Sequence, residues 1–301
     1  MSELKGACVI GQSGGPTSVI NSSVLGALEA ALDNPSITRV FGMAHGIKGL
    51  LNDDLYDIDK EDRDELALLR YTPSSALGSC RYKLAEPSQD DTDYRRILEI
   101  FRKYDVRYFF YNGGNDSMDT CNKISKYMQS VGYACRVIGV PKTIDGDLKN
   151  KWIETSFGFD TACKVYSEMI GNIQRDCNSS KKYYHFIKLM GRSASHIALE
   201  CALQTQPNIC IISEEVQAKR MTLDNSQIAY FIAERAKIGW NFGTVLIPEG
   251  LIEFIPSMKK LIEELNDILA EHSEEIAQYE EIEKLQKVHS YLSPANAELF
   301  K

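Results

Sequence analysis

One short segment of this sequence combines a lysine, a hydroxyl group and two carboxylates, the side chains that suit transfer of a phosphoryl group. It reads Pro-Lys-Thr-Ile-Asp-Gly-Asp over residues Pro141–Asp147. The lysine can neutralise phosphate charge, one carboxylate can accept a proton from a hydroxyl, and either carboxylate can help to hold Mg²⁺. Taken alone, the segment is equally well explained as a plain Asp-Gly-Asp loop without chemistry.

Two glycine-rich turns would let the backbone approach an anionic ligand closely. Gly113–Ser117 (Gly-Gly-Asn-Asp-Ser) follows an apolar run, and a helix that begins at Ser117 would direct its free N–H groups at an anion. An ordinary strand-to-helix turn with Asp116 or Ser117 as cap is the alternative. The second turn, Gly11–Thr17, matches neither the Walker ending Gly-Lys-Ser/Thr nor the dinucleotide pattern Gly-x-Gly-x-x-Gly.

Two further short motifs place a charged side chain after an apolar run. Met190–Arg192 (Met-Gly-Arg) offers a guanidinium, which can bind phosphate through two parallel hydrogen bonds. Pro248–Gly250 (Pro-Glu-Gly) offers a carboxylate that suits sugar hydroxyls. Alone, each motif is more often structural than functional.

The elements that must position these motifs are short β-rich runs that alternate with helical patterns. This alternation predicts parallel sheets with right-handed crossovers and helices on both faces, in which ligands bind at the carboxyl ends of strands. The four motifs above and the Gly11–Thr17 turn all follow expected strands. We expect strands at 7–10, 40–43, 107–111, 137–140, 185–190, 209–212 and 244–247, and helices at 18–32, 94–104, 117–131, 159–176, 194–204 and 228–237.

Residues 257–292 are rich in Glu, Lys, Leu and Ile at helical spacing. The pattern predicts a charged helical hairpin near the C-terminus, with a solvated outer face.

Composition excludes several classes of function. The formal net charge of −8 argues against general binding to nucleic acid or anionic membranes. No signal-peptide pattern begins the sequence, and no run approaches the roughly 18 apolar residues that span a bilayer. Eight cysteines without a Cys-x-x-Cys pair indicate reduced thiols in a cytoplasmic protein, and five scattered histidines lack metal-ligand spacing.

Five motifs, in this order and spacing, resemble the phosphofructokinases, most closely their pyrophosphate-dependent branch. The resemblance covers about residues 6–255. It implies a reversible, Mg²⁺-dependent phosphotransferase of glycolysis, which moves a phosphoryl group from pyrophosphate to the C1 hydroxyl of fructose 6-phosphate. The motifs are Gly113–Ser117, Pro141–Asp147, Gly158–Ala162 (Gly-Phe-Asp-Thr-Ala), Met190–Arg192 and Pro248–Gly250.

The resemblance also implies the fold class α/β, with two similar doubly wound parallel-sheet (Rossmann-like) domains and the active site in the cleft between them. We expect a donor-binding domain over residues 1–145, an incomplete sugar-phosphate-binding domain over 146–255 and a helical segment over 256–301.

Matched residue by residue, the resemblance implies roles for individual side chains. Asp145 matches the catalytic base, and Lys142 and Asp116 act with it. The donor phosphates are expected to contact Gly15, Arg81, Gly114 and Asn115. The sugar phosphate is expected to contact Thr143, Ile144, Asp145, Met190, Gly191, Arg192 and Glu249.

Two positions indicate the phosphoryl donor. ATP-using members of the family resemble Gly-Gly-Asp-Gly-Ser and Pro-Gly-Thr-Ile-Asp, whereas here Asp116 and Lys142 replace one glycine of each motif. A carboxylate at position 116 would fill the space of the nucleotide α-phosphate and repel its charge. Lys142 can compensate the carboxylate and bind a phosphate of pyrophosphate. The pair therefore favours pyrophosphate over ATP.

Two departures from the family pattern remain. Asn115 stands where ATP enzymes have an aspartate linked to Mg²⁺. Its amide oxygen can still bind Mg²⁺ but without charge, so we expect metal binding to shift to Asp145, Asp147 and pyrophosphate itself. The resemblance also leads us to expect a Gly-Tyr-Glu-Gly-Arg-like segment beyond Lys301, which would complete the sugar-phosphate site. A truncated sequence is the reading we favour.

Other functions stay open at this point. An ATP-dependent 6-phosphofructokinase, or a kinase for a related sugar phosphate such as sedoheptulose 7-phosphate, is the first alternative. A non-catalytic subunit that senses phosphorylated metabolites is the second. For the leading hypothesis we expect pyrophosphate and fructose 6-phosphate as the ligands, no nucleic acid or membrane partner, and a homo-oligomer, either a dimer or a tetramer.

Overall fold

The computed structural model describes residues 4–221, 227–276 and 278–300; the outermost residues of our predicted segments, 1–3 and 301, lie outside this part. Backbone contacts divide the chain into two units. Unit 1 comprises Met1–Ile144 and Asn150–Thr161, and unit 2 comprises Asp145–Lys149 and Ala162–Lys301. The predicted α/β fold class is confirmed, because each unit contains a sheet with parallel strands and flanking helices.

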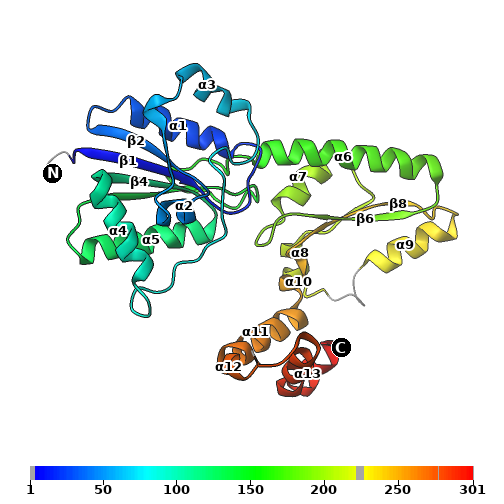
Figure 1. The fold of residues 1–301 in the computed structure, drawn as a ribbon. Helices are drawn as coiled ribbons and strands as arrows, with labels where there is room; N and C mark the ends of the chain where they lie inside the picture. The colour runs from blue at the N-terminus through cyan, green and yellow to red at the C-terminus, as the bar shows by residue number, and fades with distance from the viewer. Residues whose placement is uncertain (1–3, 222–226, 277, 301) are drawn as a thin grey trace. The chain divides into compact units, whose positions relative to one another are not determined.

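Unit 1 contains a five-stranded sheet in the order β3-β2-β1-β4-β5 (Figure 1). All neighbouring pairs are parallel except β2 and β3, which run antiparallel. β3 is a short edge strand that the sequence pattern did not predict. The strands are β1 (Gly6–Gln12), β2 (Ile37–Met43), β3 (Leu55–Asp57), β4 (Val106–Gly113) and β5 (Arg136–Pro141).

The central strand β1 is buried along its whole length and divides the core of unit 1 into two layers. Ala7 and Val9 pack into one hydrophobic cluster with α4 (Thr92–Tyr104) and α5 (Asn115–Ser130). Cys8 and Ile10 pack into the other cluster with α1 (Ile20–Leu32). A strand buried on both faces is typical of parallel sheets covered by helices on each side.

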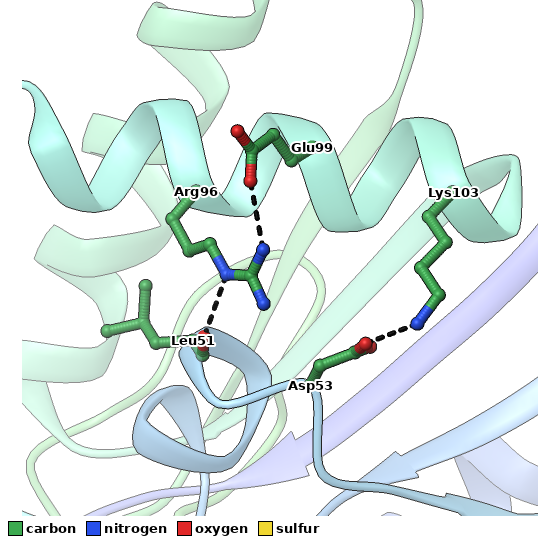
Figure 2. A network of polar contacts seen from close by, with 5 residues as sticks. All are labelled: Leu51, Asp53, Arg96, Glu99 and Lys103. Carbon is green, nitrogen blue, oxygen red and sulfur yellow. Dashed lines mark hydrogen bonds and ion pairs between the residues drawn. The ribbon is translucent and has the colours of Figure 1, made fainter.

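Polar contacts fix α4 against the short helix α2 (Ile47–Leu51) and the residues after it, as Figure 2 shows. Arg96 donates through Nε to the carbonyl oxygen of Leu51 at 3.0 Å and pairs with Glu99 at 2.9 Å. Lys103 pairs with Asp53, and this hydrogen bond lowers the pKa of the Asp53 carboxyl. Unit 1 also contains α3 (Arg63–Ala67) and 3₁₀ turns at Ile58–Lys60 and Leu68–Tyr71.

Unit 2 contains a three-stranded parallel sheet in the order β6-β8-β7. Gln174 of α6 donates to Thr244 of β8 at 3.3 Å, which ties that helix to the central strand. Its strands are β6 (Tyr184–Leu189), β7 (Ile209–Cys210) and β8 (Gly243–Pro248). The helices that precede the C-terminal helical segment are α6 (Phe159–Ser180), α7 (His196–Thr205), α8 (Ser213–Ala218), α9 (Gln227–Lys237) and α10 (Leu251–Phe254).

The predicted charged hairpin is present, but as part of a group of four helices with a core of its own. Leu261, Ile268 and Val288 belong to this core. Glu264 accepts hydrogen bonds from the backbone N–H of Ser293 at 2.6 Å and from its hydroxyl at 2.9 Å, which fixes the start of the last helix. The four are α11 (Pro256–Glu271), α12 (Ser273–Ile276), α13 (Glu281–Tyr291) and α14 (Pro294–Leu299).

Two further observations concern membrane-spanning helices and the cysteines. Among the described residues, no helix combines the length and apolar character that crossing a membrane requires. All eight cysteines are free thiols.

Candidate active site

In unit 1, the carboxyl ends of three adjacent parallel strands bring the predicted donor loops together. Gln12 at the end of β1 pairs with Asn112 of β4, and Gly113 pairs with Pro141 at the end of β5. The backbone N–H of Lys142 then donates to the carbonyl oxygen of Gly113 at 2.9 Å. The turns that follow β1, β4 and β5 therefore lie at one edge of the sheet.

The turn after β4 needs glycine at position 113 for space. A Cβ on Gly113 would stand 2.1 Å from Ser117 Oγ and 2.9 Å from the carbonyl oxygen of Ser13, closer than real atoms approach. A Cβ on Gly114 would stand 3.8 Å from Lys142 Nζ, so the lysine ammonium lies beside this turn. The open backbone and the ammonium together suit a phosphate group.

Helix α5 begins earlier than the sequence pattern predicted. Its first residue is Asn115, not Ser117, and Gly114 occupies the N-cap position. Asp116 and Ser117 therefore lie within the first turn, so the alternative in which one of them caps the helix is wrong. Ser117 is buried, and its side chain packs against Gly113.

Arg81 lies beside the Gly11–Thr17 turn because hydrogen bonds attach its loop to the end of β1. Leu77 donates its backbone N–H to Gln12 Oε1 at 3.0 Å. Gly14 donates its N–H to the carbonyl oxygen of Cys80 at 3.1 Å and accepts from Ser79 Oγ at 2.9 Å. These contacts bring Arg81 Nη2 to 4.0 Å from the Cβ position of Gly15.

In unit 2, the turn that carries Asp145 is attached to the start of α7. Gly146 has φ +78°, a left-handed conformation that favours glycine. Its carbonyl oxygen lies 2.9 Å from His196 Nδ1. Ser193 donates through Oγ to the Asp147 carboxylate at 3.2 Å.

The Met-Gly-Arg and Pro-Glu-Gly motifs interlock at the carboxyl ends of β6 and β8. The backbone N–H of Glu249 donates to the carbonyl oxygen of Leu189 at 2.8 Å, and the N–H of Gly191 donates to Glu249 Oε1 at 3.4 Å. A Cβ on Gly250 would stand 1.8 Å from the carbonyl oxygen of Arg192, so only glycine fits there. The two motifs thus fix each other's backbone.

The carboxylates of unit 2 form an electrostatic group around Asp145. Burial raises the pKa of the Asp145 carboxyl, and the negative charges of Asp147 and Glu249 raise it further. The guanidinium and the backbone N–H of Arg192 oppose that rise. A carboxyl group with this surrounding can accept a proton and sits beside a cation that suits a phosphate.

The structure describes the predicted site residues as two sets. Unit 1 contains Lys142, Thr143, Ile144, the residues of the Gly113–Ser117 turn, Gly15 and Arg81. Unit 2 contains Asp145, Asp147, the Met190–Arg192 motif and Glu249. How the two sets act on one substrate pair stays a prediction, as do the individual roles.

Sequence reasoning missed two residues that lie near the predicted ones. Tyr166 of α6 has a pKa raised by burial and by neighbours that include Glu249 and Asp145. His196, one of the five histidines that lack metal-ligand spacing, contacts Gly146. The sequence offered one signal for His196: it follows shortly after Arg192 and begins the next helix, α7.

The residues predicted as Mg²⁺ ligands carry oxygen donors, the chemical type that Mg²⁺ prefers. Among the described residues, no group of three or more His, Cys, Asp or Glu side chains could hold a metal ion by itself. Protein Mg²⁺ sites in phosphoryl-transfer enzymes usually rely on one or two carboxylates together with substrate phosphates. The Asp147 carboxylate in unit 2 and the Asn115 amide in unit 1 are oxygen donors of the required kind.

Comparison with known proteins agrees on one family. The family model described as "Phosphofructokinase" matches residues 7–290. A pyrophosphate–fructose 6-phosphate 1-phosphotransferase from Porphyromonas gingivalis is 51% identical over 275 residues, which is 90% of this chain and 49% of the relative. A protein of the same name from Entamoeba histolytica is 48% identical, over 89% of this chain and 48% of the relative. The chain spans about half the length of these curated relatives.

A solved structure supports the same fold. The crystal structure of a pyrophosphate-dependent phosphofructokinase from Nitrosospira multiformis aligns with a TM-score of 0.69 and 33% sequence identity. The alignment covers 81% of this chain and 60% of that one.

Proposed function

The chain belongs to the phosphofructokinase family, and from this premise we propose that the protein transfers a phosphoryl group from pyrophosphate to the C1 hydroxyl of fructose 6-phosphate. The products are fructose 1,6-bisphosphate and phosphate. Relatives whose names carry this activity are 51% and 48% identical to the chain over the aligned half of their own length, which supports the proposal.

The observation that carries the choice of donor is the position of Lys142. Its ammonium lies 3.8 Å from the Cβ position of Gly114, beside the first turn of α5, and Asp116 is in that turn. A lysine at this place adds positive charge where the backbone already approaches an anion. The Asp116 carboxylate in the same turn disfavours the additional phosphate of a nucleotide. Both features support pyrophosphate over ATP.

Arg81 extends the same donor surface in unit 1. Its guanidinium approaches Gly15, whose turn is held by backbone hydrogen bonds to the Ser79–Cys80 segment. We assign contacts with the pyrophosphate oxygens to Gly15, Arg81, Gly114 and Lys142.

In unit 2, we assign the acceptor to the carboxylate group around Asp145. The Asp145 carboxylate accepts the proton of the C1 hydroxyl while the hydroxyl oxygen forms its bond to phosphorus and the bridging P–O bond of pyrophosphate breaks. Arg192 binds the 6-phosphate, and Glu249 accepts hydrogen bonds from sugar hydroxyls. Thr143, Ile144 and the Met190–Gly191 backbone complete the predicted sugar contacts.

Mg²⁺ would neutralise negative charge on pyrophosphate when it is bound. We propose Asp147 and Asn115 as the residues that contribute oxygen donors to it. Ser193 orients the Asp147 carboxylate through the 3.2 Å hydrogen bond described above.

We further propose the cytoplasm as the compartment, supported by the free thiols, since reducing compartments keep cysteines unpaired. A homo-oligomer, dimer or tetramer, stays a prediction that a measurement of molecular mass in solution tests.

The test is a coupled assay of the complete polypeptide that the gene encodes, with pyrophosphate and with ATP in separate reactions. Pyrophosphate should give at least about tenfold higher kcat/KM, equivalent to roughly 1.4 kcal/mol. Equal or better turnover with ATP would overturn the choice of donor and favour an ATP-dependent kinase. Turnover with neither donor would favour a metabolite-sensing subunit.

A further inference from the structure

The loop Asp145–Lys149 is held against the start of α7 by a contact with His196 that has no part in the proposed substrate binding. We infer that His196 is a positioning residue, whose ring Nδ1–H holds the carbonyl oxygen of Gly146 and thereby fixes the turn that carries Asp145. The inference rests on the proposed function only where it concerns the role of Asp145 as the base.

The chemistry of the contact determines the state of the ring. His196 Nδ1 lies 2.9 Å from the Gly146 carbonyl oxygen, a normal hydrogen-bond distance. A carbonyl oxygen can only accept, so the hydrogen must be on Nδ1. The neutral His196 ring is therefore the Nδ1–H tautomer, whereas an unrestrained histidine side chain in water prefers the hydrogen on Nε2.

The turn needs such an anchor because its conformation is specific. Gly146 has φ +78°, and the peptide group that follows it carries the carbonyl oxygen that His196 holds. Asp145 directly precedes this glycine, so the contact fixes the backbone one residue from the Asp145 carboxylate. Ser193 provides a second attachment one residue later, at Asp147. Two points of attachment fix the orientation of a turn better than one.

His196 is itself held in place by the neighbouring helix. It is the first residue of α7, directly after Ser195. The backbone N–H of Ser195 donates to Glu214 Oε1 at 3.0 Å, and Ser195 Oγ accepts from the N–H of Ser213 at 2.9 Å. Ser195 is buried, with 3% of its surface exposed. The start of α7 is thereby fixed to the start of α8, which gives the His196 ring a rigid base.

The first test reads the tautomer in the unmodified protein and needs no activity. Histidine labelled with ¹⁵N shows in a long-range ¹H–¹⁵N spectrum which ring nitrogen carries the hydrogen. The His196 signals are identified by their loss in His196→Ala, among the five histidines of the sequence. We expect the Nδ1–H form at a pH where the ring is neutral. An Nε2–H ring would overturn the inference.

The second test measures how well the turn is held, by hydrogen exchange of the peptide that contains Asp145–Lys149. His196→Ala should speed exchange in this peptide. His196→Asn should restore it, because the asparagine amide can place an N–H near the position of Nδ1. Equal exchange in the wild type and the alanine variant would show that the contact holds nothing.

The third test separates positioning from a merely structural role, using the complete encoded polypeptide. His196→Ala should lower kcat by about tenfold to a hundredfold while the KM for fructose 6-phosphate stays within about twofold, since small displacements of a reacting group mainly slow the chemical step. His196→Asn should recover most of the lost kcat. Loss of kcat in both variants alike, or in neither, would contradict a positioning role through this hydrogen bond.

The chain offers a matched control. His289 Nε2 contacts the carbonyl oxygen of Ala297 at 3.2 Å among the C-terminal helices, so His289→Ala removes the same kind of contact elsewhere. It should change thermal stability without the loss of kcat. An equal loss of kcat in this variant would reduce the His196 effect to general destabilisation. If the wild type lacks pyrophosphate-dependent turnover, the proposed function fails, while the tautomer and exchange results still decide the inference.

Discussion

The two units support their site residues in different ways. In unit 1, the central strand β1 is wholly buried, and the adjacent turns are held by hydrogen bonds from residues far along the chain, such as Leu77 to Gln12. In unit 2, β6 lies at an edge of a three-stranded sheet, and 56% of the Phe186 side chain is exposed. Both units have hydrophobic cores, but the central strand of unit 1 is buried along its whole length, whereas the edge strand β6 of unit 2 is partly exposed.

The two units also differ in the charge of the side chains that their loops present. The unit 1 turns present backbone and the cations Lys142 and Arg81, which suit an anion that needs only to be bound. The unit 2 loops present the Asp145 carboxyl, whose pKa is raised by burial and further by the negative charges of Asp147 and Glu249. We therefore expect substitutions in unit 1 to change mainly donor binding and stability. Substitutions in unit 2 should change mainly the chemical step and sugar binding.

The largest effect should come from Asp145, the proposed base in unit 2. Asp145→Asn keeps the shape of the side chain but cannot accept the hydroxyl proton, so kcat should fall by a factor on the order of 10² to 10⁴. Binding of fructose 6-phosphate, measured by calorimetry, should persist. A loss smaller than about fivefold would show that Asp145 is not the base and that the chemical division between the units is wrong.

The difference in packing predicts unequal stability changes for two phenylalanines on strands. Phe109 of β4 in unit 1 is fully buried, and its truncation to alanine should lower the free energy of unfolding by about 3–5 kcal/mol. Phe186→Ala on β6 is the matched variant and should cost less than about 1 kcal/mol, as expected at an exposed position. Urea unfolding measures both. Similar losses would contradict the contrast between core and edge.

Two arginines test whether the units bind different ligands. Arg192→Ala in unit 2 should weaken fructose 6-phosphate binding by about 1.5–3 kcal/mol, the usual contribution of a charge-assisted contact. Arg81→Ala in unit 1 should instead raise the KM for pyrophosphate and leave that for the sugar phosphate nearly unchanged. Steady-state kinetics with each substrate varied in turn measures both. An interchange of the two effects would reverse the assignment of ligands to units.

The smallest effect concerns the donor preference within unit 1. The double variant Asp116→Gly, Lys142→Gly removes the carboxylate and the ammonium beside the first turn of α5. The ratio of kcat/KM for pyrophosphate over ATP should then fall by about tenfold, or roughly 1.4 kcal/mol. Asp119→Gly serves as the control, because this exposed residue lies on α5 but pairs with Lys123. A ratio that stays constant in the double variant would remove these two side chains from the explanation of donor choice.

Much of the fold could be predicted because long elements repeat a pattern. Every strand and helix named from the sequence is present with small shifts at its ends. The short edge strand β3 was missed, since three residues are too few to show a period. The C-terminal segment was taken for a hairpin because a hydrophobic pattern does not reveal that Glu264 fixes the start of another helix at Ser293.

Site residues could be predicted from the sequence only where a motif contains side chains suited to the chemistry. Lys142, Asp145 and Arg192 are recognisable from their neighbours in the sequence. The start of α5 was misplaced, because Gly114, and not the polar residue Asp116 or Ser117, occupies its N-cap position. His196 was overlooked for a similar reason, since its partner is a backbone oxygen 50 residues away. Backbone partners leave no trace in residue types.

The assignment of Asp145–Lys149 to unit 2 has a consequence for the time course of synthesis. All five strands of unit 1 have been made when the ribosome reaches residue 142, whereas the Asp145 turn must wait for Arg192, His196 and Glu249. At about 5–20 residues per second, the roughly one hundred residues up to Glu249 take about 5–20 s to appear. The turn with the base therefore emerges early but acquires its final conformation late. All strands that precede the proposed donor loops are thus available before the Asp145 turn has its partners.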